Sequence, residues 1–398
     1  MNKFKVLDLF SGAGGMAEGF LQAGFSVPYA SDKSLQAAET YTHRHRQLGY
    51  DVKYYCGDVE KLAEKDELRG FLDYSIDNID VICGGPPCQG FSMAGQRNPD
   101  DTRNKLVRSY IKILSQVKPK YFVMENVLGI LSAKFTEYDG VDRAYNNELV
   151  VNVLLSEFKS IGYSNVEVKT LDASDFGVPQ RRYRVIFLGT RDDVSVKVKH
   201  PEPLLTNKIS ASEAIDDLTD ISYGESVFDY NKETNSAYQI ESRTGRTKSV
   251  SSISMQGAML MNHQTSIHNE LVIERFSLLK EGETVRSLLN RLLPSKKNQL
   301  NTKKQNCKKI VRSIPSPTVL TLPDDLVHYS KSRILTVREM ARLQSFDDSF
   351  EFLGKRTTGG SLRKHETPQY TLVGNAVPPL LAKAIAKEIM DALLELED

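Results

Sequence analysis

A short apolar strand followed at once by a glycine-rich turn and a helix is the feature that most constrains this chain. Residues Phe4 to Leu9 suit a buried strand, and Met16 to Ala23 suit a helix. Between them stands the run Phe10-Ser11-Gly12-Ala13-Gly14-Gly15. Glycines let the backbone approach a ligand closely and aim N–H groups at it from a helix start. This beginning predicts an α/β fold with a ligand site at the carboxyl end of the first strand.

The next two predicted strands each deliver a carboxylate to the same edge. Gly12, Gly14 and Ala17 fit the dinucleotide-binding fingerprint, and Asp32, after the strand Ser26 to Ala30, is placed to accept from a ribose hydroxyl. Asp58 follows the strand Val52 to Cys56, where it could accept from an adenine amino group. These positions predict a nucleoside-bearing cofactor, with NAD as one candidate. The alternatives are a structural glycine turn and a solvated turn Asp.

Length and composition limit the number of domains and the kinds of site that the chain can form. The chain has 398 residues, and single cores seldom exceed ~250–300, so two domains are expected. A net charge of +1 means that any nucleic-acid contact must come from local clustering. The four cysteines form no C-x-x-C pair, so neither a metal nor a disulfide framework is expected. Without a signal sequence or a run of ~20 apolar residues, we expect a soluble cytoplasmic protein.

A cysteine stands at the mouth of the fourth predicted strand. The strand Ile79 to Cys83 runs into Gly84-Gly85-Pro86-Pro87-Cys88. Pro87 restrains the backbone, so the Cys88 thiol is held in one direction, and the segment Gly90 to Gly95 around Ser92 suits a mobile loop. A free Cys is more often a buried, inert hydrophobe. Here the strand Tyr121 to Met124 carries Glu125 to the same edge, which favours a reactive site.

Later segments extend the α/β pattern. A helix is expected over Lys105 to Val117 and another over Asn147 to Ile161. The strands Val166 to Leu171 and Arg184 to Thr190 have a short connection and are expected as an antiparallel edge pair. Arg182 and Arg184 are two residues apart, so their side chains leave the same face, either beside the crevice or as solvated charges.

Near the end of the chain the sequence has helix signals again. Thr336 and Glu339 have the spacing of a capping box. The last helix carries an apolar stripe of Leu381, Ile385 and Ile389, which we expect to dock on the first sheet.

The middle of the chain, from about Asp192 to Tyr329, has a different composition, rich in Ser, Thr, Asn and Lys. We interpret it as a second domain. Its acidic group from Glu213 to Asp220 is expected to be a solvated helix face rather than a metal site. Six lysines lie in a stretch without acidic residues and suit either a phosphate-contacting surface or a solvated loop: Lys296, Lys297, Lys303, Lys304, Lys308 and Lys309.

Taken together, these motifs resemble those of the DNA (cytosine-5) methyltransferases of bacterial restriction-modification systems. The match spans both ends of the chain and leaves only the middle unmatched. The chain departs from the family at Leu372, where the family often has Gln. The similar segments, in the family order, are Phe10 to Gly15, Pro86-Pro87-Cys88-Gln89, Glu125-Asn126-Val127, Gln180-Arg181-Arg182-Tyr183-Arg184, Arg333 to Gln344 and Gly374-Asn375-Ala376-Val377.

The resemblance implies a Rossmann-like, S-adenosylmethionine-dependent methyltransferase fold: an α/β class with a mostly parallel sheet, an antiparallel edge pair and a smaller target-recognition domain. Residues 1–191 and 330–398 would form the catalytic, cofactor-binding domain, and residues 192–329 the DNA-binding recognition domain. The implied catalytic residues are Cys88, Glu125, Arg182 and Arg184. The implied cofactor contacts are Phe10, Gly12, Ala13, Gly14, Gly15, Asp32, Asp58, Val59, Pro87, Leu106, Asn375 and Ala376. The implied DNA contacts are Gln89, Ser92 and Arg103. In the middle region, where the resemblance is silent, Lys303 and Lys304 are expected DNA contacts because of their charge.

The residue types suit this chemistry. Carbon 5 of cytosine is a poor nucleophile, so a thiolate, here Cys88, must first add at carbon 6. Glu125 can donate at ring nitrogen 3 as charge develops there. Arg184 is expected to hold the cytosine carbonyl oxygen, and Arg182 to orient Arg184 or Glu125. The base must be flipped out of the duplex, and closure of the Ser92 loop would hold it there.

Three alternatives stay open at this point: an NAD-dependent oxidoreductase, a non-enzymatic DNA-binding relative and an RNA methyltransferase. The first gives no role to Cys88 beside Glu125, and the second need not keep either residue. The long variable domain disfavours the third. The expected partner is double-stranded DNA in the bacterial cytoplasm or nucleoid, without a membrane or an obligatory protein partner. A restriction endonuclease that acts on the same site is a candidate companion.

Overall fold

The computed structural model of the chain describes residues 4–73, 76–87, 104–141, 143–203, 207–251, 259–358 and 366–397. The backbone divides into two compact units. The first unit comprises Met1–Ala173, Tyr183–Pro203 and Pro379–Asp398, and the second comprises Ser174–Arg182 and Leu204–Pro378. This division follows compactness and does not test which segment recognises DNA.

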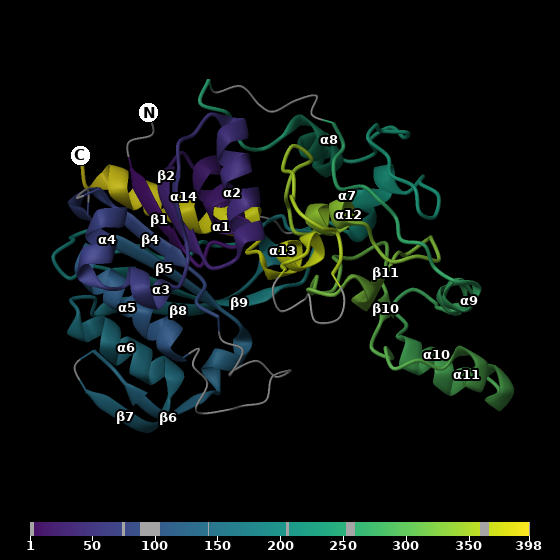
Figure 1. The fold of residues 1–398 in the computed structure, drawn as a ribbon, viewed down its shortest axis with the longest axis horizontal. Coiled ribbons are helices and arrows are strands. Elements are labelled where there is room, and N and C mark those ends of the chain that lie inside the picture. Colours follow the sequence, from purple (N-terminus) through teal and green to yellow (C-terminus); the bar gives the residue numbers. More distant parts are fainter. Residues whose placement is uncertain are drawn as a thin grey trace. The chain divides into compact units, whose positions relative to one another are not determined.

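The first unit is built on a seven-stranded sheet of order β3-β2-β1-β4-β5-β9-β8 (Figure 1). All neighbouring strands run parallel except at β9, which is antiparallel to both β5 and β8. The predicted fold class, with its antiparallel edge pair, is thereby confirmed. The strands are β1 (Lys5–Leu9), β2 (Ser26–Asp32), β3 (Lys53–Cys56), β4 (Val81–Gly84), β5 (Tyr121–Asn126), β8 (Asn165–Asp172) and β9 (Tyr183–Thr190).

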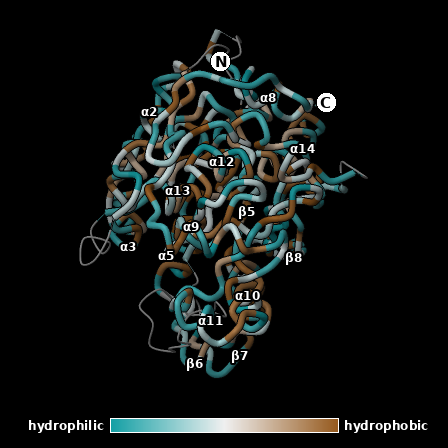
Figure 2. The backbone as a smooth tube through the Cα atoms, turned by 90° about the vertical axis from the view of Figure 1, so that its right-hand side faces the viewer, coloured by the Kyte–Doolittle hydropathy of each residue, from teal (hydrophilic) through white to brown (hydrophobic). Residues whose placement is uncertain are grey.

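The central strands are apolar on both faces because helices cover both. Leu7 and Leu9 join a core cluster with helix and strand residues such as Tyr110 and Phe122, whereas Asp8 between them faces the opposite side. Figure 2 shows hydrophobic, brown backbone at β5. The helices of this unit are α1 (Gly15–Gln22), α2 (Leu35–Leu48), α3 (Val59–Leu62), α4 (Lys65–Phe71), α5 (Asn104–Val117), α6 (Val150–Ser160) and α14 (Pro379–Glu395).

The last helix returns to the start of the chain. In α14 the predicted stripe of Leu381, Ile385 and Ile389 is buried, and the helix packs against α1 (Figure 1). The stripe is buried as predicted, but the expected docking on the first sheet is corrected, because the main partner of α14 is the helix α1 rather than a strand.

The predicted helix Asn147 to Ile161 is wrong at its start. Asn147 to Leu149 belong to β7 (Ala144–Leu149), which pairs antiparallel with β6 (Lys134–Asp139), and α6 begins only at Val150. Tyr138 and Tyr145 pair across the hairpin and are buried, and Tyr145 donates to the buried Glu157 of α6 at 2.8 Å. These contacts reach across the hairpin and onto a helix, so local helix propensity does not decide the conformation.

The second unit consists of short helices, two short strands and long connecting segments around buried ion pairs. Thr336 and Glu339 form the predicted capping box, and Arg333 pairs with Glu339 at 2.7 Å. Burial by itself raises the pKa of Glu339, but Arg333 outweighs it and lowers the pKa to about 2. The elements are α7 (Ala211–Ile215), α8 (Ala237–Thr244), α9 (Glu270–Leu278), α10 (Val285–Arg291), α11 (Pro294–Leu300), α12 (Val337–Leu343), α13 (Gln369–Asn375), β10 (Lys308–Lys309) and β11 (Leu326–Val327).

The expectation that the acidic group from Glu213 to Asp220 forms a solvated face is wrong for Asp217. Its side chain is buried and pairs with Arg342 at 2.5 Å, and Arg342 also pairs with Asp348 at 2.6 Å. A distant arginine accounts for the burial, because a buried carboxylate requires a partner. Within the described ranges, every helix is too short or too polar to cross a membrane.

Candidate active site

The glycine loop leaves β1 in a tight, hydrogen-bonded turn. Gly14 donates its N–H to Ser11 O at 2.9 Å and occupies the N-cap of α1 with φ of 97°. A Cβ on Gly14 would lie 2.9 Å from Cδ2 of Tyr41, so both the conformation and the packing require glycine. Phe10 also has a positive φ, of 55°. The predicted residues from Phe10 to Gly15 therefore form one compact loop at the strand end.

Asp32 ties this loop to the end of β2. Its carboxylate accepts from the N–H of Gly12 at 3.1 Å and from that of Ser34 at 2.8 Å. Burial raises the pKa of Asp32, and these two backbone hydrogen bonds oppose that rise. The predicted pair of Gly12 and Asp32 is thus in contact, with the carboxylate bonded to the loop itself.

The other predicted cofactor residues of this unit occupy neighbouring positions. Asp58 follows β3 and caps α3, where its Oδ1 accepts from Glu60 N at 2.9 Å. Val59 is buried beside it, and Leu106 of α5 is partly buried against the same core cluster. Pro87 is half-buried after β4. Asp58 therefore has a local capping function, which its sequence position did not reveal.

Glu125 and Arg184 meet at the carboxyl end of β5. Because β9 runs antiparallel to β5, with Glu125 opposite Ile186, the start of β9 lies at the end of β5. Nε of Arg184 is 2.5 Å from Oε1 of Glu125, and the two side chains are 12% and 13% exposed. Arg184 also donates from Nη1 to Tyr183 O at 2.8 Å. The carboxylate and the guanidinium are therefore held together, yet both are accessible to a ligand.

The end of β4 lies directly against this carboxylate. A Cβ on Gly85 would be 2.9 Å from Oε2 of Glu125, so glycine permits the close approach. Asn126 donates from Nδ2 to Pro86 O at 3.3 Å and fastens the two strand ends together. The predicted residues Cys88, Gln89, Ser92 and Arg103 lie outside the described residues.

Arg182 has partners that the sequence did not indicate. It is 2% exposed and donates to Val319 O at 3.0 Å and Gly374 O at 2.9 Å, all within the second unit. These contacts support a positioning function. The expected orientation of Arg184 or Glu125 by Arg182 stays a prediction.

Two glutamines join the same buried network. Gln180 donates to Gln344 Oε1 at 2.9 Å, and Gln344 donates to Val373 O at 2.8 Å and to Ala376 O at 3.4 Å. The network thus reaches the segment that carries Asn375 and Ala376, two predicted cofactor residues. Both glutamines stand within the motifs quoted above, but their sequence positions alone indicate no function for them.

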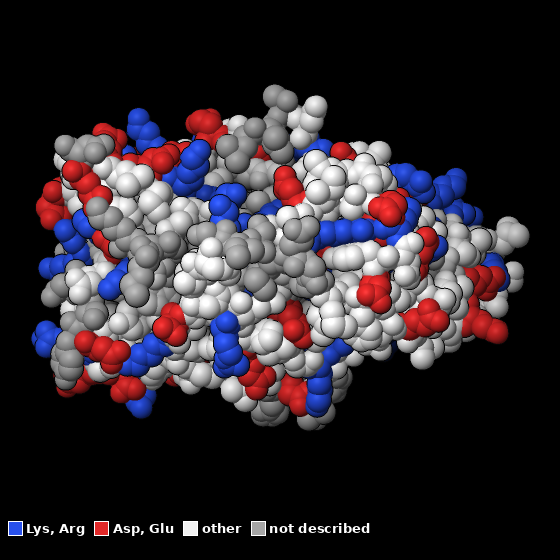
Figure 3. Space-filling model, turned by 90° about the horizontal axis from the view of Figure 1, so that it is seen from above, with Lys and Arg blue, Asp and Glu red and all other residues white. Residues whose placement is uncertain are grey.

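The basic stretch of the second unit is partly neutralised. Lys304 forms an ion pair with Asp324, and Lys296 forms one with Glu274. Lys303 is exposed. On the face drawn in Figure 3, basic and acidic groups are interspersed. Local sequence, which lacks acidic residues here, does not reveal these pairings.

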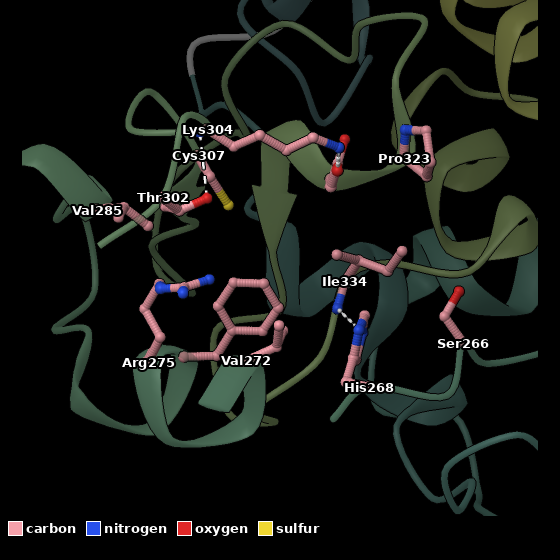
Figure 4. A pocket seen from close by; sticks show the side chains of 12 residues that line it. Ser266, His268, Val272, Arg275, Val285, Thr302, Lys304, Cys307, Pro323 and Ile334 are labelled. Atoms are coloured by element: carbon pink, nitrogen blue, oxygen red, sulfur yellow. Dashed lines mark hydrogen bonds and ion pairs between the residues drawn. The ribbon is translucent and has the colours of Figure 1, made fainter. Parts of the chain in front are cut away.

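Lys304 also borders a cavity of about 250 Å³ within this unit. Its ammonium pairs with Asp324, another lining residue, and His268 accepts from Ile334 N beside it in the wall (Figure 4). Apolar side chains such as Val272, Phe276 and Val285 supply most of the remaining wall. Because the Lys304 ammonium is engaged here, a phosphate would have to compete with Asp324 for it.

Comparison with known proteins assigns the chain to a class. The family model for C-5 cytosine-specific DNA methylases matches residues 4–391. The type II methyltransferase M.DdeI of Desulfomicrobium norvegicum is 36% identical over 396 residues, covering 96% of this chain and 88% of that protein. M.XorII of Xanthomonas oryzae pv. oryzae is 30% identical, with 97% and 84% covered. A solved structure described as a prophage-encoded DNA modification methyltransferase of E. coli aligns with a TM-score of 0.73 at 24% identity, covering 98% and 99% of the two chains; it supports the fold.

The chain therefore belongs to the family of C-5 cytosine-specific DNA methylases. It is a DNA (cytosine-5) methyltransferase, which decides against the oxidoreductase, binding-only and RNA-methylating alternatives.

Proposed function

We propose that the chain transfers the methyl group of S-adenosylmethionine to carbon 5 of a cytosine flipped out of a specific duplex DNA sequence, through a covalent adduct with Cys88. The observation that carries this proposal is the position of Glu125. Its carboxylate pairs with Arg184 and lies against Gly85, at the strand end from which the chain runs through Pro86 and Pro87 to Cys88. We therefore assign Glu125 as the general acid and Arg184 as a hydrogen-bond donor at the strand end that leads to Cys88.

The residues at the ends of β1 and β2 fit the proposed cofactor. A Cβ on Gly12 would meet no atom within 4 Å, so the loop backbone borders open space there. Asp32 adds a carboxylate beside that space, as recognition of ribose hydroxyls requires. Phe10, Asp58 and Val59 would complete this side of the site. When bound, S-adenosylmethionine supplies an electrophilic methyl group on sulfur.

The chain's own residues activate the base. The Cys88 thiolate adds to carbon 6 of the flipped cytosine, which makes carbon 5 nucleophilic. Glu125, in its carboxylic-acid form, donates its proton at ring nitrogen 3 as negative charge develops there. After methylation of carbon 5, loss of the carbon 5 proton breaks the bond to carbon 6 and releases the Cys88 thiolate, and nitrogen 3 returns its proton to Glu125. Arg184 holds the carbonyl oxygen of the base, and its ion pair with Glu125 keeps the two groups together before the base enters.

Target choice is assigned to residues 192–329, the proposed recognition domain, with Gln89, Ser92 and Arg103 as further DNA contacts. Grafting that segment onto a relative should transfer sequence specificity. We propose that the enzyme protects host DNA in a restriction-modification system, in the bacterial cytoplasm or nucleoid, with an endonuclease of the same specificity as its companion. Bisulfite sequencing of a genome that expresses the enzyme would identify the target sequence.

A mechanism-based trap tests the covalent step. Duplex DNA with 5-fluorocytosine at the target should form a denaturant-stable adduct with the wild-type enzyme, because fluorine cannot leave as a proton does. Cys88→Ser should form none and should have no transfer activity, while binding the cofactor within a few-fold of wild type. Full transfer by Cys88→Ser, or a missing wild-type adduct, would overturn the proposal.

A further inference from the structure

A layer of buried polar aromatic residues lies beneath the glycine loop. The Tyr41 ring from α2 packs against Gly14, where a Cβ would come within 2.9 Å of it. Its hydroxyl donates to Oδ2 of Asp8 at 3.3 Å, and Tyr41 and Asp8 are 0% and 1% exposed. Asp8 also accepts from the Cys83 thiol at 3.5 Å. The carboxyl group of Asp8 on β1 therefore holds the ring on which the loop rests.

A second tyrosine holds the loop from the β3 side. The hydroxyl of Tyr54 is 3.0 Å from Oγ of Ser11, the residue before Gly12. The Tyr54 and Tyr41 rings meet edge to face with centroids 5.2 Å apart, and Tyr41 stacks on His45 at 4.5 Å. Such contacts lock side-chain rotamers, so each tyrosine restricts the other.

The two tyrosines contact Ser11 and Gly14, which flank Gly12 and Ala13 in the loop. Ser11 N–H already donates to Ser31 O at 3.0 Å, and Gly12 N–H to Asp32 at 3.1 Å. The contact of the Tyr54 hydroxyl with the Ser11 hydroxyl adds to the backbone hydrogen bonds that already fix this turn. A site is precise only when the residues that shape it are themselves held in place.

We infer that Tyr41 and Tyr54, with Asp8, are positioning residues that pre-organise the glycine loop for S-adenosylmethionine. The inference rests on the proposed function of that loop. None of the three is assigned a contact with the cofactor or the base, so they act through Gly14 and Ser11. Loss of either hydroxyl should weaken cofactor binding and leave the chemical step unchanged.

The test uses Tyr54→Phe and Tyr41→Phe in the full-length enzyme, with Tyr163→Phe as the matched control. Tyr163 is also buried in the first unit, and its hydroxyl donates to Pro119 O at 2.7 Å. Calorimetric titration with S-adenosylhomocysteine, which cannot react, should give Kd values about 3- to 10-fold higher for the two loop variants, as for one lost hydrogen bond. The control should bind like wild type. KM for the methyl donor should rise in parallel with Kd, while kcat stays within about two-fold.

A double-mutant cycle separates positioning from general destabilisation. In a Ser11→Ala background, Tyr54→Phe should cause no further loss of affinity, because its partner is already gone. Additive losses, or equal losses in Tyr163→Phe, would overturn the inference, as would unchanged affinity in both loop variants. A wild-type enzyme that does not bind S-adenosylhomocysteine would instead contradict the proposed function.

Discussion

The strand-end site around Glu125 and the lysine segment 296–309 contrast in how their charges are partnered. Glu125 and Arg184 are brought together by the register of adjacent strands, with β9 antiparallel to β5. Lys296 and Lys304 are instead paired with Glu274 and Asp324, about twenty positions away along the chain. Sheet edges collect functional side chains in a predictable place, whereas surface charges take whichever partner the tertiary fold supplies.

The largest expected effect lies at the strand-end site. Glu125→Gln should reduce the methylation rate by about two to four orders of magnitude, because Gln donates a hydrogen bond but cannot give up a proton. Single-turnover methylation of a target duplex measures it, and DNA binding should survive. Glu137→Gln, on the exposed side of β6, is the control. A normal rate for Glu125→Gln would make this carboxylate structural and remove the basis of the comparison.

The buried carboxyl group of Asp8 makes the stability of the protein depend on pH. Burial raises its pKa from 3.8 to about 7, against the hydrogen bonds from Cys83 and Tyr41, and the nearby Asp32 adds to the rise. Tyr54 and Tyr110 are the other titratable groups nearby. Between these pH values the folded protein keeps a proton that the unfolded chain has lost. The contribution of Asp8 to the free energy of unfolding is therefore fully present below about pH 4 and is lost as pH rises toward 7. The total loss of unfolding free energy is on the order of 4 kcal/mol.

Asp8→Asn cannot titrate, so it should not show this decline. Relative to wild type, its unfolding free energy should increase as pH rises from 4 to 7. Urea unfolding across that range measures the difference between the two proteins. Parallel pH profiles would show that the carboxyl of Asp8 keeps an ordinary pKa in the folded state.

The next largest effect is expected at Gly85, whose backbone lies close to the Glu125 carboxylate. Gly85→Ala would place a Cβ 2.9 Å from Oε2 of Glu125 and displace the carboxylate. Since small displacements of a catalytic group are costly, kcat should fall about 10- to 100-fold. Gly70→Ala is the matched control, because a Cβ there meets no atom within 4 Å. Equal activity of the two variants would mean that the strand-end geometry is looser than its hydrogen bonds indicate.

The smallest effect concerns the lysine segment. Lys303→Ala should weaken binding to target and non-target duplexes alike and reduce the slope of log K against log salt by about one. Lys304→Ala should reduce it less, because Asp324 already engages that ammonium. Salt titrations of DNA binding measure both. A Lys303/Lys304 double variant that methylates a new sequence with its salt slope intact would show that these lysines read bases rather than phosphates.

Much of the candidate site could be predicted because its residues lie in short local sequence patterns. The apolar strand before Phe10 to Gly15, and the placement of Asp32, Asp58 and Glu125 after their strands, followed from periodicity and turn residues. The antiparallel pair β8 and β9 and the Thr336 capping box could be predicted in the same way. Each depends on contacts within a few residues or on the rule that parallel strands end at one edge.

The sequence by itself thus determined the fold class and supplied the residues that are proposed to react, since periodicity and glycine placement are local features. Only the tertiary structure decided the partners of the buried polar groups: Asp8 with Tyr41, Asp217 with Arg342, and Arg182 with Gly374 O. It likewise decided that Asn147 belongs to a hairpin. The physical reason is shared, because a buried charge or hydroxyl must be paired, and its partner is selected by packing between segments remote in sequence.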